Sequence, residues 1–133
     1  FPTLYISWKK HYFSYQLPCF DACIIPAKTN PFTRVKTNNR VLLALQSGVP
    51  VVASPIPSYL EFAPYIGFEN WHDNLRAIAL NPTKAKNNVK LGQQFIQQHY
   101  DSSIITQQWL DFITTIQHQK ISIPLNPQKA LAV

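Results

Sequence analysis

The residues best suited to chemistry in this chain are basic side chains gathered around one predicted loop. Lys28, Arg34 and Lys36 lie between residues 26 and 36, and Arg40 follows within the first turn of a predicted helix. The N-terminus of a helix carries a partial positive charge and free N–H groups, so cations beside it favour an anionic ligand. This pattern predicts a binding site for a phosphate group.

The elements around this loop predict where the site lies. Residues 22–25 and 50–53 are short apolar runs typical of buried strands, and residues 39–47 have the spacing of a helix that ends at Gly48. Two such strands joined by a helix favour a parallel sheet. Ligands of parallel sheets bind beyond the carboxyl ends of the strands, here loops 26–36 and 54–59.

The other elements extend this into an α/β domain with a short parallel sheet. Residues 3–7 are rich in strand formers and are predicted to be the third strand. Residues 8–17 have mostly helical spacing, Ser58 is predicted to cap a short helix through Phe62, and residues 65–68 form a short extended piece. Helices are expected at 69–80, with Trp71, Leu75, Ile78 and Ala79 inward, and at 82–99 after the Asn81-Pro82 start signal.

The final predicted helix, about 102–118, is capped by Asp101 or Ser102 and is strongly amphipathic. Its apolar stripe includes Ile105, Trp109, Phe112 and Ile116, and such a stripe needs a partner surface. Residues 119–133 contain two prolines and no periodicity, which predicts an irregular tail. We therefore expect one partial Rossmann-like domain over residues 1–118, followed by that tail.

Composition narrows the classes of partner. The 133 residues are 46% hydrophobic and 14% charged, as in a globular domain, and the net charge of +6 favours an anionic partner. The basic residues are scattered, which favours a focused phosphate site over a nucleic-acid surface; we expect no nucleic-acid partner. Cys19 and Cys23 lack a second Cys/His pair at zinc spacing, so we expect no metal site. We expect their thiols to be reduced, as in a cytoplasmic protein.

No apolar run is long enough to span a bilayer, and the positive charge leaves peripheral association with a membrane open. The chain opens at Phe1 in what looks like a strand, so we expect it to begin inside a larger protein.

The order of these features resembles a known family. The chain looks like the C-terminal part of a GT-B fold glycosyltransferase, one of the nucleotide-sugar-dependent transferases. The resemblance covers roughly residues 8–115, and its most specific part is Gly48-Val49-Pro50-Val51-Val52; the other matching segments are residues 21–26, Lys36 with Asn39-Arg40, and residues 44–47, 57–61, 92–100 and 105–109.

This resemblance implies a donor-binding domain that works with an N-terminal acceptor domain, which the chain lacks. It implies transfer of a sugar from a nucleotide-sugar, which is a substrate and not a cofactor, to a glycan or lipid-linked acceptor. The chain is then a fragment that is inactive without the other domain. The alternative is a non-catalytic nucleotide-binding or interaction module of the same architecture.

The expected donor site combines the resemblance with the basic loop. Lys36, Asn39 and Arg40 are predicted to contact the phosphates, and Ser54, Tyr59 and Glu61 the sugar or nucleotide. Each has a plainer alternative: Lys36 as a solvated charge, Arg40 paired with a carboxylate, Asn39 as an ordinary first-turn residue, Glu61 paired with a local cation. Retaining members of the group often carry two glutamates eight positions apart, and the corresponding residues here are Val35 and Leu43. The catalytic residues and the stereochemical class therefore stay open.

Overall fold

A computed structural model describes residues 3–7, 9, 12 and 15–118 of the chain. Half of the predicted helix at 8–17 and the whole predicted tail at 119–133 lie outside these residues. Just before the sheet, a short 3₁₀ helix, η1 (Leu17–Cys19), begins at the residue before Pro18.

The centre of the fold is a three-stranded sheet of β1 (Cys23–Ile25), β2 (Val51–Ala53) and β3 (Gly67–Phe68), in that order. Both strand pairs are parallel: Ile24 lies opposite Val52, and Val52 lies opposite Gly67. The predicted α/β class with a parallel sheet is confirmed, and it fits a Rossmann-like arrangement.

The first predicted strand is wrong. Residues 3–7 have no regular secondary structure, and Leu4 and Tyr5 are exposed. The third position in the sheet belongs instead to β3, within the segment predicted only as a short extended piece. Strand propensity mainly reflects burial and cross-strand packing, so strand-forming residues without a neighbouring strand need not pair.

The basic loop is also more ordered than predicted, because it contains the short helix α2 (Pro31–Arg34). The Asn30 side chain accepts a hydrogen bond from the Thr33 amide at 2.9 Å, and the Thr33 hydroxyl accepts one from the Asn30 amide at 3.0 Å. This reciprocal capping box satisfies amides that a helix start leaves open. The Thr33 hydroxyl also donates to the Lys28 carbonyl at 2.7 Å, so the loop has a defined shape.

The predicted crossover helix is present as α3 (Asn39–Gln46) and packs against β1 and β2. Val41, Ala44 and Leu45 form its buried face. Gly48 follows with a φ of +82°, a left-handed conformation that suits glycine at the end of a helix.

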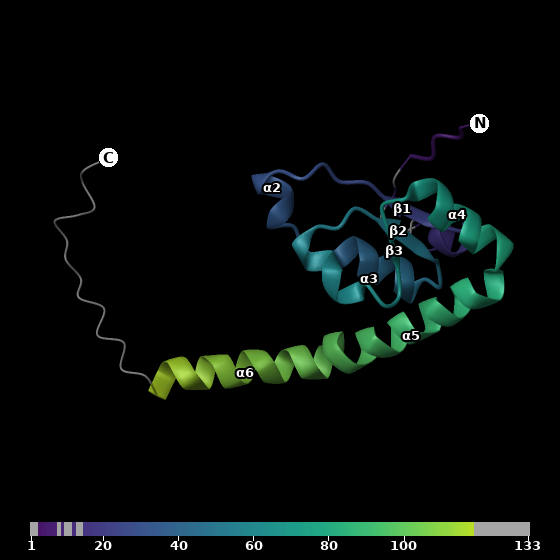
Figure 1. Ribbon diagram of the computed structural model, residues 1–133. Coiled ribbons are helices and arrows are strands. Elements are labelled where there is room, and N and C mark those ends of the chain that lie inside the picture. Colours follow the sequence, from purple (N-terminus) through teal and green to yellow (C-terminus); the bar gives the residue numbers. More distant parts are fainter. Residues whose placement is uncertain (1–2, 8, 10–11, 13–14, 119–133) are drawn as a thin grey trace, which may run out of the picture. The chain divides into compact units, whose positions relative to one another are not determined.

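Three further elements complete this part of the molecule: η2 (Pro57–Phe62), a 3₁₀ helix; α4 (Trp71–Leu80); and α5 (Pro82–Tyr100). Figure 1 shows α3 and α4 on two sides of the strands, and α4 packs against β2 and β3. Asn81 caps α5 as predicted, because its Oδ1 accepts the Lys84 amide at 3.1 Å.

Two smaller predictions for these helices are wrong. Ser58 does not cap η2, whose N-cap is Ile56, and the Ser58 hydroxyl is buried with no hydrogen-bond partner among the described residues. Ala79 is exposed, whereas Trp71, Leu75 and Ile78 are half-buried as the inner face of α4. Ala79 is too small for its position to be decided by hydrophobic burial.

Helix α5 packs against the aromatic residues of η2 and so completes the core. Phe62 is 0% exposed, and its ring meets that of Phe95 edge to face, with centroids 5.6 Å apart. Gly92 allows close approach, because a Cβ there would lie 3.1 Å from a methyl carbon of Leu45. The Gln93 side chain donates to the Leu45 carbonyl at 2.9 Å, so α5 satisfies a backbone group at the end of α3.

The chain divides into two compact units, residues 1–98 and 99–133. The second contains α6 (Ser102–His118), capped by Asp101, whose carboxylate accepts the Ser103 amide at 2.9 Å. Trp109 is 61% exposed, and its ring contacts that of Phe112 edge to face at 6.1 Å. Burial of Trp109 is therefore not found in the described chain, and the partner surface for this stripe stays a prediction.

Candidate functional site

The loops after β1 and β2 meet at the carboxyl edge of the sheet, as the sequence predicts. The Ser54 amide donates to the Ile25 carbonyl at 3.1 Å, which continues the ladder past the end of β2. The Ser54 hydroxyl accepts the Ala27 amide at 2.9 Å and fixes the start of the basic loop. Ser54 is only 7% exposed, so its hydroxyl holds the two loops together.

The N-terminus of α3 opens at this edge without a side-chain cap. The amides of Val41 and Leu42 donate to the Asn38 carbonyl at 2.9 and 3.1 Å. The Asn38 side chain points elsewhere: its amide nitrogen donates to the Glu61 carboxylate at 2.7 Å. The first-turn N–H groups of α3 are therefore not capped by the residue best placed to do so.

The Asn38–Glu61 bond joins the start of α3 to η2. It brings together two segments that the sequence assigned to one ligand edge, the phosphate-binding turn and the loop after β2. In this bond the Glu61 carboxylate accepts from a neutral amide.

The three predicted phosphate contacts lie along this turn. Lys36 is half-buried, and its Nζ lies 5.0 Å from the centre of the Phe32 ring, within range of a cation–π contact. Asn39 and Arg40 are exposed on the first turn of α3. Lys28 and Arg34 are exposed as well. A cation held by an exposed ring can still turn toward an anion, because this contact is worth only about 0.5–1 kcal/mol at exposed sites.

Arg40 is electrostatically coupled to two groups beneath the edge. Burial raises the pKa of the Cys23 thiol, and the positive charge of Arg40 partly lowers it. Burial likewise raises the pKa of the Tyr59 hydroxyl, with Arg40 lowering it and Cys23 raising it. Both groups stay neutral at pH 7, so neither neutralises the guanidinium.

The residues predicted to contact the sugar or nucleotide differ in how accessible they are to a ligand. Tyr59 is 2% exposed and belongs to the core, and Ser54 is committed to the Ala27 amide. Glu61 is exposed. Their roles as donor contacts stay predictions. The contact of Asn38 with Glu61 could not be predicted from the sequence, because it spans 23 positions and no local pattern signals it.

Several classes of site find no support in the described part of the chain. No group of His, Cys, Asp or Glu side chains there could hold a metal ion. None of the described helices is long and apolar enough to cross a membrane. No protein-family model matches the chain, and neither a curated protein nor a solved structure matches it.

Proposed function

We propose that the chain binds the diphosphate of a nucleotide-sugar at the carboxyl edge of its sheet, as the donor-binding portion of a GT-B glycosyltransferase. The observation that carries this proposal is the uncapped N-terminus of α3 at that edge, with Arg40 on its first turn and Lys36 immediately before it. Free backbone N–H groups and two cations at one helix start form an anion site of the kind that parallel α/β folds use for phosphates.

The charges in this site suit a diphosphate better than a single carboxylate. Lys36, Arg40 and the helix start together supply more than two positive charges, while Glu61 stands at one side of the turn. A diphosphate can span from the helix start to Lys36. In this proposal the Glu61 carboxylate accepts hydrogen bonds from sugar hydroxyls, since an ionised carboxylate is acceptor-only.

In the glycosyltransferase that we propose, these groups would act on the leaving group. As the bond from the sugar to the diphosphate breaks, negative charge develops on the phosphate oxygens. Cations and N–H groups already aimed at that position stabilise the transition state more than the ground state. Transfer also requires an acceptor domain, which we propose as the chain's partner.

A non-catalytic nucleotide-binding module is the second candidate, and one observation favours it. Val35, at a position corresponding to one of the family's paired glutamates, is 79% exposed beside the basic turn. Neither it nor Leu43, at the other position, can hold a hydroxyl of the donor. A module that binds nucleotide without transferring sugar would need no such pair.

Calorimetric titration with UDP and GDP tests the proposal. Lys36→Ala should weaken binding by about tenfold or more, because a hydrogen bond to a charged group contributes roughly 1.5–3 kcal/mol. Lys84→Ala, on α5, is the matched control and should bind as the wild type does. Equal affinities for wild type and Lys36→Ala would reject the phosphate role of Lys36, and no nucleotide binding by the wild type would reject the proposed function.

A further inference from the structure

A second pocket lies at the opposite end of the sheet from the proposed phosphate site. It has a volume of about 180 Å³ and is walled by β2, β3 and the helices α4 and α5. Its lining includes Pro50 and Val51 at the start of β2, and Tyr65 and Ile66 just before β3. This is the amino edge of the parallel sheet, so the site is independent of the donor proposal.

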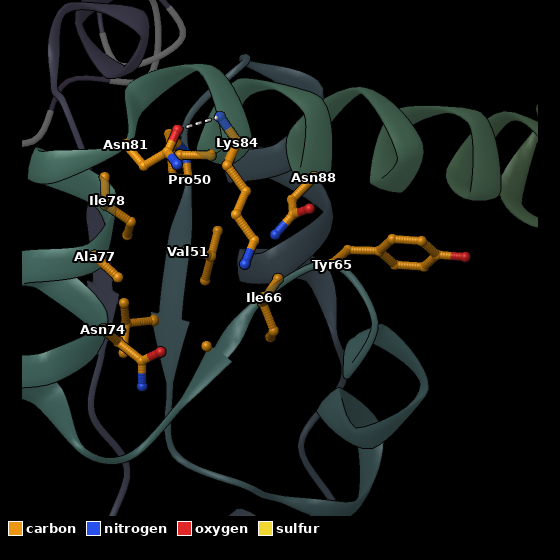
Figure 2. A pocket seen from close by; sticks show the side chains of 13 residues that line it. Pro50, Val51, Tyr65, Ile66, Asn74, Ala77, Ile78, Asn81, Lys84 and Asn88 are labelled. Atoms are coloured by element: carbon orange, nitrogen blue, oxygen red, sulfur yellow. Dashed lines mark hydrogen bonds between the residues drawn. The ribbon is translucent and has the colours of Figure 1, made fainter.

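The lining of this pocket is partly apolar, and its floor is formed by strand residues. Val51 and Ile66 lie behind it in Figure 2, with Ala77 and Ile78 of α4 along one side. For comparison of size, a closed apolar cavity of roughly 150 Å³ accepts a molecule as large as benzene. The space therefore fits an apolar body the size of one ring.

Two polar side chains of the pocket that carry donors, Lys84 and Asn88, come from α5. Figure 2 shows the Lys84 side chain running across the pocket toward Ile66, with the Asn88 amide beside it, one helical turn further along. Among the described residues that line the pocket, Lys84 is the one charged side chain; it is exposed, and no carboxylate belongs to that described lining. The Asn81 oxygen already accepts the Lys84 amide, and the Asn74 amide nitrogen donates to the loop carbonyl of Glu69 at 2.9 Å.

We propose that this pocket binds a small organic carboxylate with an apolar body, such as an aromatic or branched-chain acid. The Lys84 ammonium and the Asn88 amide are both donors, and together they can engage the two oxygens of one carboxylate. The apolar body lies against Val51, Ile66 and Ile78. The proposed ligand therefore combines an anionic end, which Lys84 and Asn88 contact, with an apolar end, which those apolar residues contact.

Benzoate is the probe that tests this proposal, by NMR titration of the whole chain. We expect amide shifts concentrated at Ile66, Gly67, Ala85 and Asn88, and binding at least tenfold tighter than that of benzamide, which has the same shape without the charge. Inorganic phosphate, which lacks an apolar body, should also bind at least tenfold more weakly. Equal binding of benzamide or phosphate would overturn the proposal, as would benzoate shifts that fall elsewhere.

Variants separate this site from the donor site. Lys84→Gln should weaken benzoate binding by about tenfold or more, since it removes a charge-assisted contact. Lys86→Gln, an exposed neighbour on α5 outside the lining, is the matched control and should bind normally. Ala77→Phe fills the mouth from an exposed helix position and should abolish binding at an unchanged thermal midpoint. Unweakened benzoate binding by Lys84→Gln, or by a folded Ala77→Phe variant, would contradict the assignment.

Discussion

At the scale of single residues, one exposed cation acts on two less exposed neutral groups. Arg40 is exposed, whereas Cys23 is half-buried, Tyr59 is buried, and both have raised pKa values. A neighbouring cation ordinarily promotes ionisation of a thiol or phenol, but here the cost of burial is the larger effect. The arrangement keeps positive charge available at the surface of the edge.

The two cysteines should therefore differ in reactivity. Cys19 is exposed and Cys23 is half-buried with a raised pKa, and the thiolate is the form that reacts. With iodoacetamide at pH 8, Cys19 should be alkylated first. Labelling of Cys23 should rise only when the pH exceeds 9.0, the ordinary pKa of a cysteine thiol. Peptide mass mapping over time measures both rates. Equal labelling in denaturant is the control, and equal rates in the native chain would contradict the burial of Cys23.

At the scale of elements, the crossover could be read from the sequence because local signals agreed with tertiary packing. The β1–α3–β2 segment combines apolar runs, a helical stripe and Gly48, and each signal points to the same structure. The sequence does not predict α2, although Asn30-Pro31 is the same start signal as Asn81-Pro82, which predicts α5. The reason is that α2 is one turn long and has no apolar stripe to mark it as a helix.

The rest of the site could not be predicted from the sequence, because it depends on long-range contacts. Glu61 was placed at the correct edge, but its bond to Asn38 depends on how η2 folds back. Burial of Tyr59 likewise depends on that turn. The pocket at Lys84 required the placement of α5 across the amino edge of the sheet, which no local pattern specifies.

A tight contact behind β3 provides a prediction at this scale. A Cβ on Gly67 would lie 2.6 Å from Oδ1 of Asn74, whose side chain ties down the loop between β3 and α4. Gly67→Ala should displace Asn74 and destabilise the chain by about 1–2 kcal/mol, the cost of one or two hydrogen bonds. Urea denaturation measures the loss.

The control is the same substitution made in an Asn74→Ala background. There the clash is absent, so Gly67→Ala should cost clearly less, and the difference is the coupling energy of the pair. If Gly67→Ala lowered stability equally in the two backgrounds, contact with Asn74 would not be the reason that position 67 needs glycine.

At the scale of the whole molecule, stability should come from the unit that contains the sheet. Phe62 is 0% exposed and Phe32 is 71% exposed. Phe62→Ala should destabilise the chain by about 3–5 kcal/mol through lost burial and a cavity. Phe32→Ala, the matched control, should cost no more than about 1 kcal/mol, the contribution of an exposed cation–π contact with Lys36. Similar urea midpoints for the two variants would contradict the assignment of Phe62 to the core.

The two proposed sites lie at opposite edges of the sheet. One lies at the carboxyl edge of the sheet, around Lys36 and Arg40, and the other at the amino edge, around Lys84. Because the strands are parallel, α3 begins at the first edge and directs its free N–H groups there. A diphosphate and a small carboxylate should therefore bind at opposite ends of one sheet.

The most direct test of the central claim is an NMR titration of the wild-type chain with UDP. The proposal predicts that the largest amide shifts fall on Asn39 and Arg40, with smaller ones at Lys36 and Glu61, and that Ile66 and Asn88 do not move. No shift at the start of α3, or shifts confined to the amino edge of the sheet, would contradict a diphosphate site at the carboxyl edge.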